Sequence, residues 1–100
     1  MTAVTFFRDG KQITGYEASG HTDYSEAGSD IVCAAVSSAL YMAANTLTEI
    51  VGARADVIVE DGYLKILLLD KIAQCQPVLR GLALHLNGLM EQYSPFLHIQ

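Results

Sequence analysis

The 100-residue chain has an apolar fraction of 51% and a charged fraction of 17%, a balance that excludes intrinsic disorder, which requires the opposite. This length suits a single domain, residues 1–100, because two separate hydrophobic cores cannot be built from so short a chain. Six Lys and Arg against eleven Asp and Glu give a net charge of −5. The negative charge argues against a nucleic-acid surface or an anionic membrane surface and suits a basic partner.

The N-terminal segment and the cysteines favour a reduced, cytoplasmic setting. Met1–Arg8 has no basic stretch followed by a long apolar run, so we expect no secretion signal. The apolar stretch Ile31–Ala44 is fourteen residues long and contains two serines, so no membrane span is predicted. Cys33 and Cys75 lack CxxC spacing, which leaves both thiols free for packing or for chemistry.

Two β-hairpins are predicted. β-branched and aromatic residues indicate strands in four segments, Val4–Phe7, about Gln12–Ser19, Ala55–Glu60 and Tyr63–Leu69. Asp9-Gly10 lies between the first two strands and Asp61-Gly62 between the last two, and both dipeptides are strong turn signals. The polar, glycine-containing segment His21–Ser29 that follows the first hairpin is expected to be a loop.

Two helices are expected, one after each hairpin. Asp30 is the predicted N-cap of a helix that runs to about Ile50 and ends at Gly52. This helix is apolar almost all round, so we expect it to be buried on more than one face. The second helix is predicted to begin near Gln76, because Pro77 then takes the first helical position. It carries an apolar stripe at three-four spacing: Leu79, Leu82, Leu86, Leu89 and Tyr93.

Ser94-Pro95 ends the second helix, and Phe96–Ile99 is expected to form a closing edge strand. The element order is therefore β-β-α-β-β-α-β. Paired hairpins predict an α+β fold with a mainly antiparallel sheet and two helices packed together on one face.

His21 and Cys33 are the residues to which the sequence assigns chemistry. Cys33 stands third in the predicted helix, where unpaired backbone N–H groups and the helix dipole stabilise a thiolate. A histidine at the end of the preceding strand can take the thiol proton and later protonate a leaving amine. Spacing alone leaves two alternatives open, an inert buried cysteine and a surface histidine in a loop.

The segment Gly20–Ser37 resembles the family of ribosomal-processing cysteine proteases called Prp. It contains Gly20-His21, a short loop with Gly28, and the block Asp-Ile-Val-Cys-Ala-Ala-Val-Ser that ends at Ser37. One departure is Ala35, a position that is often glycine in relatives. The rest of the chain matches in length and element order only.

The resemblance implies a bacterial cytoplasmic cysteine endopeptidase, active as a homodimer and without a cofactor. Its substrate would be the N-terminally extended form of large-subunit ribosomal protein twenty-seven, recognised in part through an aromatic pair shortly before the scissile bond. By motif position, His21 matches the catalytic histidine and Cys33 matches the nucleophile. Asp30 and Ser37 match further positions that the family keeps.

Two roles stay open for each of these supporting residues. Asp30 either caps the helix or orients His21, and Ser37 either bonds back to a helix carbonyl or contacts the histidine or the substrate. Gly20 and Gly28 are candidate hinges for the Thr22–Ser29 loop, which we expect to order over a bound substrate.

The remaining candidate groups receive structural interpretations. Cys75 has no matching motif and is predicted to be a packing residue. His85 and His98 lack metal-ligand spacing with either cysteine, so no metal site is predicted. The alternative function is a non-catalytic ribosome-assembly or interaction module with an oxidisable thiol. A thiol-disulfide enzyme is disfavoured because CxxC is missing.

Overall fold

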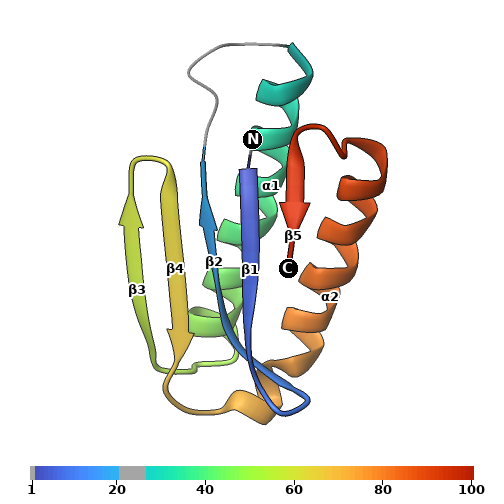
Figure 1. Cartoon of the computed structure of the whole chain (residues 1–100). Coiled ribbons are helices and arrows are strands. Elements are labelled where there is room, and N and C mark those ends of the chain that lie inside the picture. Colours follow the sequence, from blue (N-terminus) through green and yellow to red (C-terminus); the bar gives the residue numbers. More distant parts are fainter. Residues whose placement is uncertain (1, 21–26) are drawn as a thin grey trace.

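The computed structural model describes the backbone of residues 2–20 and 27–100, with side chains for 2–20 and 31–100. The elements along the chain are β1 (Thr2–Asp9), β2 (Gln12–Ser19), α1 (Ala27–Asn45), the π-helical η1 (Thr46–Ile50), β3 (Ala55–Glu60), β4 (Tyr63–Leu68), α2 (Ile72–Gln92) and β5 (Leu97–Ile99) (Figure 1). The predicted order of strands and helices is confirmed.

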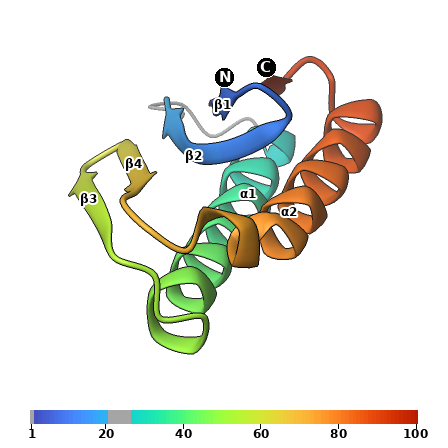
Figure 2. The same ribbon diagram turned by 90° about the horizontal axis from the view of Figure 1, so that it is seen from below.

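The five strands form one sheet in the order β3-β4-β2-β1-β5. Every neighbouring pair is antiparallel except β1 and β5, which are parallel. Both helices cover the same face of the sheet, with α1 and α2 side by side (Figure 2). The predicted α+β class, with a mainly antiparallel sheet, is therefore confirmed.

The first helix begins earlier than predicted. Because α1 begins at Ala27, Asp30 is its fourth residue and the N-cap prediction is wrong. The predicted loop is also too long at its C-terminal end, since Ala27–Ser29 is helical. Alanine, glycine and serine are tolerated in a first turn, where backbone N–H groups need no helical acceptor, so composition did not locate this boundary.

The second helix also begins earlier than predicted, at Ile72, after Lys71 in a left-handed conformation with φ of 50°. Pro77 therefore lies inside α2 rather than at its start. Its missing N–H leaves the carbonyl of Ala73 without the usual helical donor. Ala73 is exposed, so water can satisfy this carbonyl and the helix tolerates the proline.

Gln76 connects the start of α2 to the sheet. Ile13 lies beyond the last β2–β4 pair, Gly15–Leu67, so no strand satisfies its backbone on that side. The Gln76 amide accepts the N–H of Ile13 at 2.8 Å and donates to its C=O at 2.8 Å. Both residues are buried, so the side-chain amide takes the place of the missing strand.

The core lies between the helices and the sheet. On α1 and η1 it is formed by a stripe at helical spacing, which comprises Val32, Val36, Leu40, Ala43, Ala44 and Leu47. On α2 the predicted stripe is confirmed, with Leu79, Leu82 and Leu86 buried and Leu89 and Tyr93 packed against the core. Tyr16 of β2 is fully buried, and its hydroxyl donates to the carbonyl of Leu40 at 2.8 Å. This bond joins the centre of the sheet to α1.

The outer face of α1 and η1 is not covered by the part of the chain that the structure describes. Met42 is 66% exposed and Ile50 is 80% exposed, so the expectation of burial on several faces is wrong for this side. By length and composition alone, with a hydropathy of 1.5, Ile31–Ile50 could cross a membrane, but here one face of it packs on the sheet.

Candidate active site

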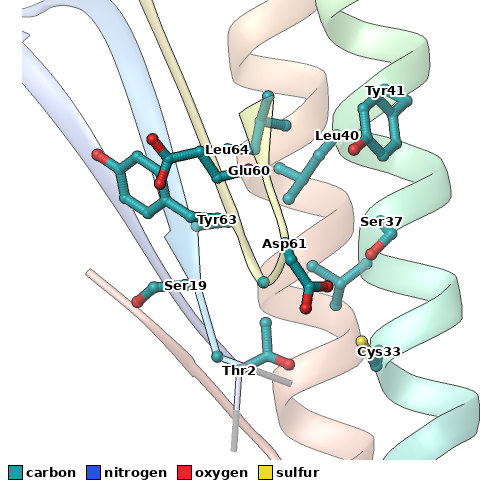
Figure 3. A pocket seen from close by; sticks show the side chains of 14 residues that line it. Thr2, Ser19, Cys33, Ser37, Leu40, Tyr41, Glu60, Asp61, Tyr63 and Leu64 are labelled. Atoms are coloured by element: carbon teal, nitrogen blue, oxygen red, sulfur yellow. The ribbon is translucent and has the colours of Figure 1, made fainter. Parts of the chain in front are cut away.

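A cleft with a volume of about 210 Å³ lies between α1 and the turn that joins β3 to β4. Its helical wall includes Cys33, Ser37 and Leu40, and the opposite wall includes Asp61 and Leu64 (Figure 3). The two walls come from segments far apart in the sequence, so only the fold brings them together.

Cys33 is placed at this cleft by the packing of α1. Val32 and Val36 on either side are buried against the sheet, whereas Ala34 is exposed. Cys33 lies at the boundary between these two faces, half-buried, with its sulfur in the cleft wall. Solvent can therefore reach the thiol without any unfolding of the helix.

The predicted position of Cys33 within the helix is wrong. It is the seventh residue of α1 and not the third. The free N–H groups of the first turn belong to residues 27–30, about 4 to 9 Å away along the helix axis. Because the effect of a helix dipole falls off within the first turn, the helix start is not directly beside the sulfur.

Ser37 follows Cys33 by four residues and lines the same cleft one helical turn further on. Gly20 lines the cleft from the sheet side, and its N–H donates to the carbonyl of Gly62 at 3.1 Å. Gly20 has a φ of 95° and Gly62 a φ of 72°, conformations that favour glycine at both positions.

The structure thus brings together three of the predicted site residues, Gly20, Cys33 and Ser37. His21 and residues 22–26 of the predicted loop lie outside the described residues. Gly28 and Asp30 lie in the first turn of α1, where only the backbone is described, so Gly28 is helical and not a loop hinge.

Tyr63 borders the cleft, but its side chain turns to the face of the sheet away from the helices. Its hydroxyl donates to the carboxylate of Glu17 at 2.8 Å. This hydrogen bond raises the pKa of the Tyr63 hydroxyl above its usual value, so the group stays protonated at neutral pH. Tyr63 is therefore not a base for Cys33.

The β3–β4 turn was identified from the sequence only as a turn. Asp61 is the residue of that turn that adds a charge to the cleft. In the sequence, Asp61-Gly62 indicates only a hairpin turn, so this contribution to the cleft was not predicted. No spacing between Cys33 and Asp61 could indicate their proximity, because it depends on how the sheet packs under α1.

Cys75 contrasts with Cys33 in its surroundings. It is fully buried in the core, and burial raises the pKa of its thiol. A buried thiol with a raised pKa is a poor nucleophile at neutral pH, which agrees with the predicted packing role.

An accessible cysteine in the wall of a cleft, with a hydroxyl one turn away, is an arrangement suited to a thiol nucleophile acting on a peptide. The comparison with protein families agrees with this class. The family model described as "Cysteine protease Prp" matches residues 1–98. The chain belongs to the Prp family of cysteine proteases.

Individual relatives support this assignment. The ribosomal processing cysteine protease Prp of Staphylococcus aureus (strain Mu50) is 30% identical over 94 residues, which cover 91% of this chain and 88% of the relative. A crystal structure of the S. aureus Prp in complex with a substrate peptide is 26% identical, with a TM-score of 0.90 over 100% of this chain and 98% of that one. A second crystal structure, with a covalently linked product peptide, is 27% identical, with a TM-score of 0.86 and the same coverage.

Proposed function

We propose that this chain is an endopeptidase that removes the N-terminal extension of a large-subunit ribosomal protein, number twenty-seven of that subunit, through a Cys33–His21 dyad. The observation that carries the proposal is the accessible thiol of Cys33 in a cleft wall, in a chain of a cysteine protease family. The relatives that are ribosomal processing proteases support a ribosomal protein as the substrate.

The proposed reaction is acyl transfer through a thioester. His21 takes the proton of Cys33, the sulfur attacks the scissile carbonyl carbon, and the carbonyl oxygen takes the negative charge. The C–N bond then breaks, and the leaving amine takes the proton from His21. Water attacks the thioester while giving a proton to His21. The C–S bond then breaks, the product acid leaves, and His21 returns the proton to the sulfur. This sequence balances without a cofactor.

Ser37 is proposed to support this reaction from one turn further along the helix. Its place in the cleft wall favours a contact with substrate or with the histidine over a purely helical role. Because Asp30 is the fourth residue of α1 and not its cap, we propose that Asp30 orients His21.

We further propose that the protein acts as a homodimer in the cytoplasm. Leu84 on α2 is 78% exposed, and together with Met42 and Ile50 it leaves the helical layer with large apolar side chains in solvent. Where such side chains gather into one patch, they mark a surface that is covered in an assembly. Sedimentation equilibrium gives the test, since a monomeric mass at micromolar concentration would contradict the dimer.

The decisive experiment combines cleavage and labelling. The purified chain is incubated with the N-terminally extended ribosomal protein of its own organism, and product masses are read. We expect one cut that releases a short N-terminal peptide, and loss of that cut in Cys33→Ala. The alternative, a non-catalytic interaction module with an oxidisable thiol, predicts no cleavage and no fast-reacting cysteine in an alkylation assay.

A further inference from the structure

We propose that Asp61 makes the cleft selective for peptides that carry a lysine or arginine close to the scissile bond. This inference rests on the proposed function, because it concerns the substrate of the same site. In this proposal, a single turn residue makes the cleft prefer a basic side chain of the substrate over a neutral one.

The direction of the Asp61 side chain is the first observation. Its carboxylate points into the space between the β3–β4 turn and α1, on the side where Cys33 and Ser37 lie (Figure 3). The neighbouring acid, Glu60, points the other way, toward Tyr63. Glu60 pairs with Tyr63 across the hairpin, which places both side chains on the face of the sheet away from the helices.

The position of Asp61 is also fixed by the backbone around it. It occupies a two-residue turn whose second residue, Gly62, has a φ of 72°. The carbonyl of Gly62 accepts the N–H of Gly20, which ties the turn to the end of β2. The carboxylate is therefore carried on a held turn, and little backbone ordering entropy is lost when it binds a cation.

The charge balance of the cleft gives the sign of the preference. Among the described residues that line it, none is a lysine or an arginine. A cationic side chain of a bound peptide therefore meets Asp61 without a competing positive charge from this lining. A neutral side chain gains nothing from the carboxylate, and an acidic one is repelled by it.

The test uses peptides that differ by one charge. A fluorogenic peptide carries a single lysine, placed in turn at each of three positions on either side of the scissile bond, and each peptide has a matched glutamine version. For the best position we expect kcat/KM to be about two- to fivefold higher with lysine, the range for a solvent-exposed ion pair.

The variants isolate the role of Asp61. In Asp61→Asn, which keeps a residue suited to the turn, we expect this ratio to fall to about one. In Asp61→Lys we expect glutamine to be preferred over lysine. Asp56→Asn is the matched control, because it removes the same charge from an exposed position of β3 whose side chain lies on the far face of the sheet. It should keep the wild-type ratio.

Each possible result either supports or overturns the inference. A wild-type ratio of about one at all six positions, or an unchanged ratio in Asp61→Asn with the fold intact by circular dichroism, overturns the inference and leaves the proposed function in place. Equal loss of the ratio in Asp56→Asn also overturns it, because net charge would then be the cause. Failure to cleave any peptide, with or without lysine, overturns the proposed function and this inference with it.

Discussion

Replacing Gln76 by leucine tests whether one buried amide substitutes for a strand at the end of the sheet. Leucine has a similar volume but can neither accept the N–H of Ile13 nor donate to its C=O. Each of these two buried backbone groups is then left without its partner, at a cost of about 1–3 kcal/mol. The added apolar burial returns about 1 kcal/mol.

We therefore expect Gln76→Leu to lower the free energy of unfolding by about 1–5 kcal/mol. The third hydrogen bond of this amide, to the carbonyl of Ile72, adds little, because that carbonyl can also accept the backbone N–H four residues on. A loss of this size is a large share of the roughly 5–15 kcal/mol that stabilises a domain.

The measurement is urea denaturation followed by circular dichroism, with Gln74→Leu as the control. Gln74 lies in the same turn of α2 but is exposed, so its substitution should change the unfolding free energy by less than about 0.5 kcal/mol. Equal values for the two variants would refute the argument, since water would then be satisfying Ile13 as well as the amide does.

Four further outcomes are expected. Cys33→Ser should abolish peptide cleavage with the fold intact, whereas Cys75→Ser should keep most activity; the reverse pattern would contradict the assignment of the nucleophile. Gly15→Ala should lower stability by about 3 kcal/mol or more, because an added Cβ would lie 2.1 Å from the carbonyl oxygen of Ile66. Gly81→Ala, with open space around it in α2, should instead raise stability by about 0.5–1 kcal/mol in thermal melts. Finally, kcat/KM for a lysine-rich extended substrate should fall as the salt concentration rises, while kcat stays constant. An equally flat response for neutral and basic substrates would show that the net charge of −5 has no role in substrate recognition.

The sequence was sufficient for the elements whose signals are local. β2 lies where its β-branched and aromatic residues and the preceding turn predicted it, and Gly52, with a φ of 79°, ends the first helical segment as expected. The start of α2 could not be found in this way, because Pro77 is tolerated only where the carbonyl it leaves free faces water. That condition depends on the packing of the whole helix on the sheet.

The candidate site shows the same division between local and tertiary information. The block around Cys33 was recognised from its own residues, and the structure places Ser37 on the same wall of the cleft. Asp61 is adjacent to them only because β4 pairs with β2 and α1 crosses above that pair. A contact of this kind leaves no trace in the order of residues along the chain.

The hydrogen bond from Tyr16 to the carbonyl of Leu40 has a consequence for inhibitor design. It joins a fully buried strand residue to α1 less than one turn after Ser37, so the helical wall of the cleft cannot slide over the sheet without breaking it. An inhibitor warhead aimed at Cys33 can therefore be fitted to this wall as a fixed template. Selectivity between relatives is better sought at the opposite wall, where the exposed Asp61 can be exchanged without disturbing the core.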